Sequence, residues 1–330
     1  MGLLFKGEKE EEEQRSRCHL LWLHETGNDE HVIIDPMDNE RKLQIIDLPQ
    51  LINFPFIQCL ASNHGWLLML SREDTTLFFY NPFTQAKVDL PYRRSLFEAA
   101  AFTAPPTSPD CVIYGVACYE GCVNIGVLRM GEEKKPMWRN YRIRRPGEFA
   151  AVRAVVASTS SGADGDGGNN KLWCVDCLGR VGVFEIEGGV WRVVCGVKSE
   201  KVRSVGVGGV VEVGGELVVG VRRKGAGKRG LGELYVLKEN KSGGGGEMGW
   251  EKIDGGELGG GGVYLGGIGG GVVEDGIGGV GEVFFADDFG GWCCVYGKES
   301  TDTSHLKWKL QLGNPSLGLK YTPVWIHKSA

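Results

Sequence analysis

The amino-acid sequence predicts an all-β protein, a six-bladed β-propeller of four-stranded antiparallel blades whose ring is closed by the C-terminal strand. Three observations predict this fold. Short apolar runs of strand length recur along the chain, parted by turns rich in glycine, proline and asparagine. The runs group into units of four, with the period of roughly 40–60 residues that is typical of propeller blades. No convincing amphipathic helix longer than two turns interrupts them.

The stretch LFFYNPFTQAKVDLP, residues Leu77–Pro91, illustrates the pattern. The aromatic run LFFY favours a pleated strand. Pro82 removes a backbone donor and biases Asn81 away from helix, so the strand must end there. AKVDLP resumes briefly and stops at Pro91, while the apolar run GWLLMLS lies immediately upstream. We therefore expect Leu77–Pro91 to hold the third and fourth strands of the second blade.

The same pattern recurs as six triplets of strand-like runs. In chain order they are CHLLWLHE, DEHVIIDP and KLQIIDLP; GWLLMLS, LFFY and AKVDLP; CVIYGVACY, CVNIGVLRM and MWRNYRI; KLWCVDC, RVGVFEI and VWRVVCG; ELVVGVRR, GELYVLKEN and GWEKIDG; and GEVFFADD, WCCVYGK and LKWKLQL. A further strand-like segment precedes every triplet except the first: FPFIQCLAS, SLFEAAAFTAP, EFAAVRAVVAS, VRSVGVGGVVEV and GGVYLGGIGGG. The final run of each of the last four triplets carries a tryptophan: Trp138, Trp191, Trp250 and Trp308.

The first unit therefore has three strands, and the chain ends with an apolar segment, TPVWIHKS, that has no blade of its own. An open ring would leave an exposed sheet edge, which promotes aggregation. We expect Thr322–His327 to pair into the first blade as its missing strand. Val324 and Ile326 would then point to one side of the sheet and Trp325 to the other.

Glycine is unusually abundant, with 53 residues, 32 of them between Gly206 and Gly291. Glycine weakens a strand by roughly 0.5–1 kcal/mol relative to alanine. Valine, leucine and aromatic residues nevertheless recur throughout this stretch, in ELVVGVRR, GELYVLK and GEVFFADD. The stretch is therefore predicted to be a glycine-diluted sheet with loose hairpin loops rather than a flexible linker.

Composition limits the class of protein. The chain has 330 residues, of which 42% are hydrophobic, and a net charge of −5, which argues against a general nucleic-acid binder. No apolar run reaches the roughly 18 residues that a membrane span needs. The opening MGLLFKGEKEEEEQR lacks the pattern of a secretory signal, and ten cysteines then indicate reduced thiols in the cytoplasm and/or nucleus. Residues 1–17 are expected to be an acidic, disordered tail, and residues 18–330 the propeller.

The motifs that suggest chemistry each have a simpler explanation. Cys174 and Cys177 have zinc-knuckle spacing, but no second pair exists, and residues three apart on a strand face opposite ways. Gly276–Gly281 matches the GxGxxG pattern, but the strand-like run EVFFADD follows it where a dinucleotide site needs a helix. No nucleophile elbow or helical histidine pair is present. The sequence predicts no catalytic, cofactor-binding or metal-binding residues.

Several phrases resemble the C-terminal domain of plant F-box/kelch-repeat proteins, an F-box-associated β-propeller. They are GWLLML…LFFYNPFTQAKVDLP, FTAPPTSPDCVIYGV, GELVV…LYVL…WEKI and EVFFADD, and the resemblance covers roughly residues 20–327. It implies a propeller that holds a protein target for a ubiquitin ligase. Such proteins usually open with an F-box that binds the ligase adaptor. The first fifty residues here hold an acidic run and strands, so we do not expect this chain alone to bind the adaptor.

The leading hypothesis is a non-enzymatic protein-recognition module with an unidentified protein target. Two alternatives stay open: a propeller hydrolase or sugar-binding enzyme with a central-channel site, and a degenerate paralogue whose glycine-rich blades fold poorly. As partner-binding residues we choose four arginines that follow final-strand motifs and should lie on blade-connecting loops: Arg93, Arg94, Arg144 and Arg145. A purely solubilising role for these arginines is the competing interpretation.

Overall fold

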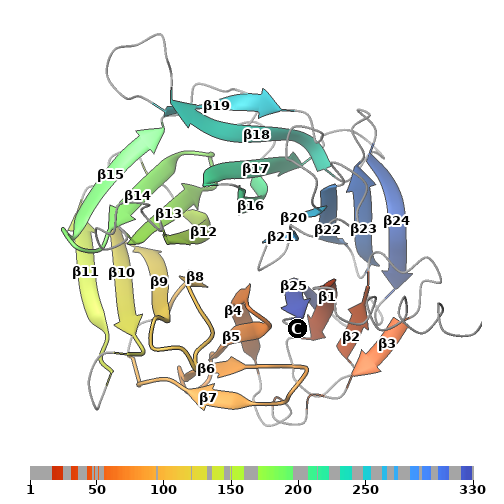
Figure 1. Ribbon diagram of the computed structural model, residues 1–330, viewed down its shortest axis with the longest axis horizontal. Coiled ribbons are helices and arrows are strands. Elements are labelled where there is room, and N and C mark those ends of the chain that lie inside the picture. Colours follow the sequence, from red (N-terminus) through yellow and green to blue (C-terminus); the bar gives the residue numbers. More distant parts are fainter. Residues whose placement is uncertain are drawn as a thin grey trace, which may run out of the picture.

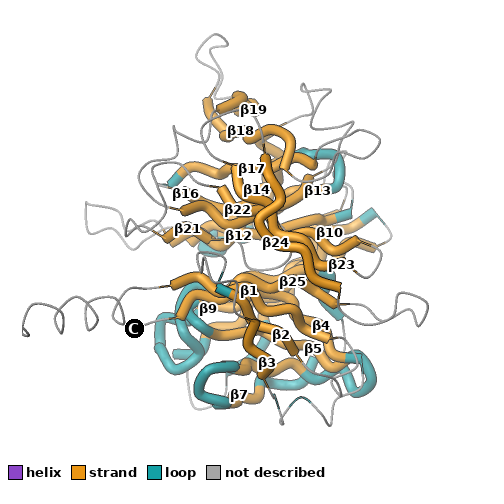
Figure 2. Tube along the Cα trace, turned by 90° about the vertical axis from the view of Figure 1, so that its right-hand side faces the viewer, coloured by secondary structure: helices purple, strands orange, loops and turns teal. Residues whose placement is uncertain are grey.

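The fold of the chain is described from a computed structural model. The described residues are 17–24, 31–35, 43–46, 48, 51, 56–93, 96–119, 121–131, 136–144, 149, 151–159, 170–195, 207–213, 215–222, 231–239, 248–253, 262–265, 271–273, 283–289, 292–298, 304–311 and 321–328. Their regular structure consists of 25 strands and, within these ranges, contains no helix (Figure 2). Residues 1–16 of the predicted acidic tail lie outside the described residues, and Arg17, its last residue, begins a strand.

The strands form sheets arranged around a central axis, as expected for a propeller (Figure 1). Five of the sheets are four-stranded antiparallel blades. One is β25 (Tyr321–Lys328), β1 (Arg17–His24), β2 (His31–Ile34) and β3 (Leu43–Ile46). The next is β4 (Ile57–Asn63), β5 (Trp66–Ser71), β6 (Leu77–Tyr80) and β7 (Lys87–Asp89).

The other three four-stranded blades follow in chain order, each with its first strand nearest the axis (Figure 1). They are β8 (Ala99–Phe102), β9 (Val112–Tyr119), β10 (Cys122–Arg129) and β11 (Arg139–Arg144); β12 (Val152–Thr159), β13 (Asn170–Asp176), β14 (Val181–Glu185) and β15 (Val190–Cys195); and β16 (Val207–Val213), β17 (Glu216–Arg222), β18 (Leu231–Glu239) and β19 (Met248–Ile253).

The prediction of six four-stranded antiparallel blades is wrong, because five blades have this form. The remaining sheet has five strands, in the order β21-β20-β22-β23-β24. Its strands are β20 (Gly262–Leu265), β21 (Gly271–Val273), β22 (Val283–Phe289), β23 (Trp292–Lys298) and β24 (Ser304–Gln311).

The difference arises in GGVYLGGIGGG, which was expected to be a single strand. It contains β20, and a second short strand, β21, begins at its last residue, Gly271. The two strands pair antiparallel, with Val263 opposite Val272. Glycine has no side chain to pack, so a glycine-rich run readily breaks where a regular strand would continue. The additional reversal of the chain makes β22 run parallel to β20, with Val263 opposite Val283. The sheet is therefore mixed.

The predicted second blade agrees with the structure in its third and fourth strands. All four residues of β6 are buried, and the strand ends immediately before Asn81. The Asn81 Oδ1 accepts hydrogen bonds from the backbone N–H groups of Phe83 at 2.9 Å and Thr84 at 3.0 Å. This side-chain turn satisfies donors that the strand ladder leaves behind. The short β7 then ends just before Leu90 and Pro91.

The C-terminal strand completes the first blade, as predicted. β25 pairs antiparallel with β1 over eight positions, from Arg17 opposite Lys328 to His24 opposite Tyr321. Val324 and Ile326 enter the apolar cluster shared with β4 to β6. The Trp325 indole Nε1 instead donates to the Leu265 carbonyl of the mixed sheet at 3.1 Å.

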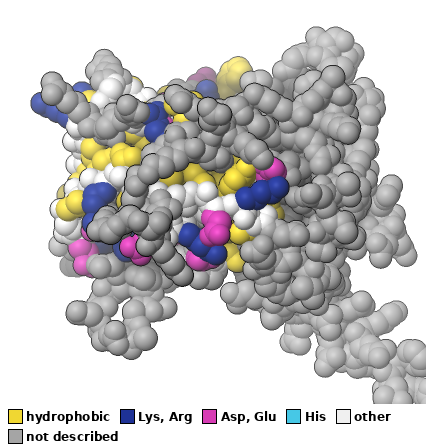
Figure 3. All heavy atoms as spheres, turned by 90° about the horizontal axis from the view of Figure 1, so that it is seen from above, with side chains coloured by type: hydrophobic (Ala, Val, Ile, Leu, Met, Phe, Trp, Pro, Cys, Tyr) yellow, Lys and Arg dark blue, Asp and Glu magenta, His cyan; other side chains and the backbone are white. Residues whose placement is uncertain are grey.

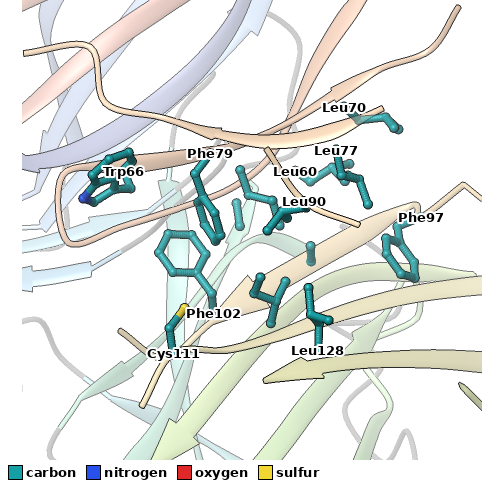
Figure 4. Close-up of a cluster of buried hydrophobic side chains, with 14 residues drawn as sticks. Leu60, Trp66, Leu70, Leu77, Phe79, Leu90, Phe97, Phe102, Cys111 and Leu128 are labelled. Carbon is teal, nitrogen blue, oxygen red and sulfur yellow. The ribbon is translucent and has the colours of Figure 1, made fainter. Parts of the chain in front are cut away.

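Apolar clusters between neighbouring blades form the core. The cluster between the β4–β7 and β8–β11 blades runs from Trp66 and Phe79 past Phe102 to Phe97 (Figure 4). Phe79 and Phe102 meet edge to face, with ring centroids 4.9 Å apart. Such aromatic pairs contribute about 0.5–1.5 kcal/mol beyond their burial. Packing between blades thus joins consecutive sheets that share no strand pairing.

Tryptophans near the outer strands add hydrogen bonds between blades. Trp138 lies just before β11, and its Nε1 donates to the Pro91 carbonyl at 3.0 Å. Trp250 lies in β19, and its Nε1 donates to the Gly179 carbonyl of the preceding blade at 2.8 Å. Trp191 and Trp308 lie in β15 and β24. The repeated tryptophan therefore marks the outermost strand or its start.

Candidate functional site

Two glycines of the β8–β11 blade allow side chains of the β7–β8 linker to pack closely against the sheet. Gly115 of β9 lies directly opposite Gly126 of β10. A Cβ atom on Gly115 would lie 2.2 Å from the Phe97 ring, and one on Gly126 would lie 1.6 Å from the Arg93 Nη1. Both distances are far below van der Waals contact, so only glycine allows this approach. The linker between β7 and β8 therefore lies directly on the sheet.

Arg93 is held against two aromatic rings on this sheet. Its guanidinium carbon lies 4.1 Å from the Phe97 ring centroid and 5.3 Å from that of Trp138. Both distances are within the range of cation–π attraction. Partial burial lowers the pKa of Arg93 to about 10, an effect that nearby Tyr119 opposes. Arg93 thus remains a cation at neutral pH and anchors the linker.

Above this packed layer the surface opens into a hollow of about 620 Å³ between the two blades. Its lining comes from β4, β5 and the turn after β5 on one side, and from the β7–β8 linker and β9 on the other: Gln58, Leu70, Arg72, Leu96, Phe97, Glu98, Ala117 and Tyr119. Leu70 and Phe97 lie at the end of the interblade cluster away from Trp66 (Figure 4). The hollow therefore begins where the interblade core ends.

The hollow lies on one face of the ring, which we call the linker face because the β7–β8 linker (residues 90–98) crosses there. The starts of β4 and β8 and the ends of β5 and β9 also lie on this face. Four large apolar side chains on the linker face are strongly exposed: Phe56 (64%), Tyr92 (69%), Leu96 (46%) and Tyr119 (47%). A gathering of exposed apolar side chains is typical of an interaction site.

Phe56 is also conformationally unusual. Its φ angle is +58°, a region that an aromatic residue rarely adopts. Its carbonyl accepts a hydrogen bond from the Arg72 backbone N–H at 3.2 Å, which joins it to the wall of the hollow. His64, Thr75 and Gln85 have similar φ angles, of +50°, +57° and +58°. Phe56 therefore lies beside the lining, linked to it through the backbone of Arg72.

Arginine side chains flank the apolar lining. The Arg72 Nε and Nη2 donate to the Gln58 Oε1 at 3.0 and 2.6 Å. On the other side, Tyr119, Cys122 and Arg144 lie opposite one another across β9, β10 and β11. Directly paired residues point to the same side of a sheet, so the exposed Arg144 shares a side with Tyr119, roughly 10 Å away. The lining of the hollow thus combines apolar side chains with Arg72 and Glu98, and Arg144 lies beyond the lining.

Comparison with known proteins assigns the fold to a family. The model of the KIB1-4 beta-propeller family matches residues 33–266, well over half of the chain. The chain belongs to the KIB1-4 beta-propeller family. This assignment confirms the expected F-box-associated propeller class, since the curated relatives are F-box and F-box/kelch-repeat proteins of Arabidopsis thaliana.

The relatives of this KIB1-4 propeller match it only in part. One Arabidopsis thaliana F-box protein is 39% identical over 83 residues, which are 25% of this chain and 21% of that protein. An F-box/kelch-repeat protein is 27% identical over 135 residues, 40% of this chain and 35% of that protein. The chain thus spans about a fifth to a third of these relatives' length. The solved structure of TolB from Acinetobacter baumannii aligns with a TM-score of 0.46 at 8% identity, over 94% of this chain and 66% of that one, a level on which we base no argument.

The four arginines chosen from the sequence occupy different environments in this KIB1-4 propeller. Arg93 lies in the β7–β8 linker, half-buried against aromatic rings. Arg144 is exposed and ends β11 instead of lying on a loop. Arg94 and Arg145 lie outside the described residues. Arg93 and Arg144 are thus both on the linker face, one beneath the surface and one on it.

Sequence reasoning missed three residues that line the hollow: Arg72, Leu96 and Tyr119. Arg72 opens the turn between two buried strands, where a charged side chain must reach solvent. Tyr119 ends the buried run of β9. The sequence could predict that both residues lie at strand ends. It could not predict that they line the same hollow, because that depends on how the sheets of two blades face one another.

No metal centre is formed by the described residues of this KIB1-4 propeller: none of their His, Cys, Asp and Glu side chains gather in groups of three or more that could hold an ion. Within the same residues, no helix has the length and apolar character of a membrane span. One carboxylate near the linker face, Asp176, is engaged locally. It accepts hydrogen bonds from the Leu178 and Arg180 backbone N–H groups and from the Arg180 side chain.

The two cysteines of the CxxC motif differ in environment. Cys174 is buried in β13, and burial is the main cause of its raised pKa, whereas Cys177 is exposed at the following turn. Burial also raises the pKa of Cys59 to about 12 and that of Cys111 to about 11. Since the thiolate is the reactive form, buried thiols should react slowly.

We predict that iodoacetamide at pH 8 alkylates Cys177 of the native protein at least about tenfold faster than Cys174, Cys59 or Cys111. Peptide mass spectrometry after timed quenching measures the four rates separately. Denaturant should make them similar, because unfolding exposes every thiol. Equal rates in the native protein would contradict the described burial.

Proposed function

We propose that this chain is a non-enzymatic protein-recognition module whose binding surface is the hollow on the linker face. The observation that carries the proposal is the concentration of exposed Leu96 and Tyr119 around a hollow of about 620 Å³. Binding pockets commonly have this size and an apolar lining with a few polar groups. Exposed aromatic residues are enriched at the centres of protein interfaces.

The names of the relatives support a finer proposal. They are F-box and F-box/kelch-repeat proteins, so we propose that the propeller holds a protein target, as the substrate-binding part of such proteins would. A segment other than the propeller would then bind the ubiquitin ligase. Co-purification of the ligase adaptor with this chain alone is not expected, and robust recovery of the adaptor would overturn that division of roles.

The test of the recognition surface compares substitutions on opposite faces of one blade. Leu96→Asp and Tyr119→Ala alter the linker face. Met137→Asp alters an apolar side chain (77% exposed) that precedes the first residue of β11, at the end of the blade away from the linker face. Each variant is used for affinity purification with quantitative mass spectrometry from the native tissue. We expect specific partners of the wild type to be lost with the two hollow variants and kept with Met137→Asp.

Thermal melting controls for folding, since all three side chains are largely exposed and their replacement should change stability little. Partner recovery that is the same for the hollow variants and the wild type would place the binding surface elsewhere. Loss with Met137→Asp alone would point to the opposite face.

A further inference from the structure

The charges around the hollow differ from those on the rim of the ring. On the rim, lysines pair with carboxylates. Side chains of both signs lie together on the part of the rim shown in Figure 3. Lys252 lies 3.0 Å from Glu233, and Lys238 lies 3.7 Å from Glu251. Such exposed pairs neutralise one another and contribute little energy.

The two arginines at the edges of the hollow lack this neutralisation. Arg72 is bound by the neutral amide oxygen of Gln58, and among the described residues no carboxylate lies within ion-pair distance of it. The same holds for the exposed Arg144, for which the described part of the chain supplies no ion pair. Arg93 adds a third cation beneath the surface.

The lining of the hollow also contains one acidic side chain, Glu98. The Glu98 Oε2 accepts a hydrogen bond from the Cys118 backbone N–H at 3.3 Å, on the β9 side of the hollow. Within the lining, Arg72 is the one arginine and Glu98 the one carboxylate, and the exposed Arg144 adds a cation beyond the lining, on the side of the sheet that carries Tyr119. Because the Arg72 guanidinium is held by a neutral amide rather than by a carboxylate, it is suited to an anionic partner group.

Arg72 is also prepared to bind a carboxylate. An arginine side chain carries five N–H donors, and Gln58 engages two of its nitrogens, Nε and Nη2. Nη1 and the second proton of Nη2 remain directed away from Gln58, while the amide holds the guanidinium in place. A side chain positioned in advance loses less conformational entropy when it binds.

From these observations we propose that the hollow binds a short protein segment in which an acidic side chain lies beside an apolar one. This inference rests on the proposed function and specifies its partner. The apolar side chain enters the hollow between Leu70, Leu96 and Phe97. The carboxylate is bound by Arg72 or Arg144, with charge-assisted hydrogen bonds that are stronger than neutral ones.

Selection of a phage-displayed library of random heptapeptides on the full chain tests the proposal. We expect enriched peptides to carry Asp or Glu adjacent to Leu, Ile, Phe or Trp. Synthetic fluorescent copies of these peptides then give dissociation constants by fluorescence polarisation. Arg72→Glu combined with Arg144→Glu should weaken binding at least about tenfold, because hydrogen bonds to charged groups are lost and like charges are introduced.

Lys238→Glu is the matched control, since it reverses an exposed cation on a distant blade, and it should leave binding unchanged. Replacing the peptide's acidic residue by its amide should weaken binding to the wild type, and raised salt should do the same. Enriched peptides without acidic residues, or acidic peptides indifferent to the arginine reversals, would overturn the inference. Tighter binding of a fluorescent single-stranded oligonucleotide at the same hollow would also overturn it.

The outcomes separate this inference from the function on which it rests. If Leu96→Asp abolishes binding of tissue partners but the selected peptides are not acidic, the recognition surface stands and the charge chemistry is wrong. If neither tissue partners nor peptides respond to changes in the hollow, both proposals fail.

Discussion

Removing residues 321–330 should lower the melting temperature of this propeller far more than removing residues 1–16. We expect this difference because β25 pairs with β1 over eight positions and so joins the two ends of the ring. Val324, Trp325 and Ile326 are each 0% exposed. Deleting them would open the apolar cluster behind β4 to β6 and leave an unpaired edge on β1. The protein without residues 321–330 should therefore be largely unfolded or aggregated.

A single substitution isolates the packing contribution. Trp325→Ala should cost about 3–5 kcal/mol, as large-to-small changes in a core do. It also leaves the Leu265 carbonyl without its indole donor. Differential scanning calorimetry of the two truncations and of Trp325→Ala measures these effects. Equal, small shifts for the two truncations would contradict closure of the ring by β25.

The second large effect is expected from Asp176→Ala. Asp176 is 0% exposed and Arg180 is 7% exposed, and the Asp176 Oδ2 lies 2.6 Å from the Arg180 Nε. Removing the carboxylate breaks a buried ion pair by deleting one partner, which costs about 3–5 kcal/mol. The turn also loses an acceptor for the Leu178 and Arg180 backbone N–H groups, bonded at 2.9 and 2.8 Å.

Urea unfolding measures the free energy of each variant. Asp176→Asn should cost less than Asp176→Ala, since the amide oxygen can still accept hydrogen bonds from the turn. Asp89→Ala is the matched control. It breaks the Lys87–Asp89 pair (2.8 Å), in which the Asp89 side chain is 69% exposed, and should cost less than about 1 kcal/mol. Similar values for Asp176→Ala and Asp89→Ala would show that the buried pair adds no more than a surface pair.

Much of the fold could be predicted because local rules decide it. Proline ends β6 and β7 whatever surrounds them, and alternation assigns Val324 and Ile326 to one side of β25 and Trp325 to the other. The mixed sheet could not be predicted. Glycine residues carry no side chain whose burial would specify strand length or register, so packing decided that β20 ends at Leu265 and that β21 pairs back onto it.

Less of the candidate site than of the fold could be predicted from the sequence. Sequence position correctly brought Arg93 to the β7–β8 linker, but that position carries no information about Phe97 and Trp138, which cover its guanidinium. That layer needs Gly115 opposite Gly126, a consequence of the β9–β10 register. By itself, the sequence determined where strands end and which side chains alternate, because those depend on neighbouring residues. Only the tertiary structure decided that Arg72 and Tyr119 line one hollow, since they come from different blades and meet only when the ring assembles.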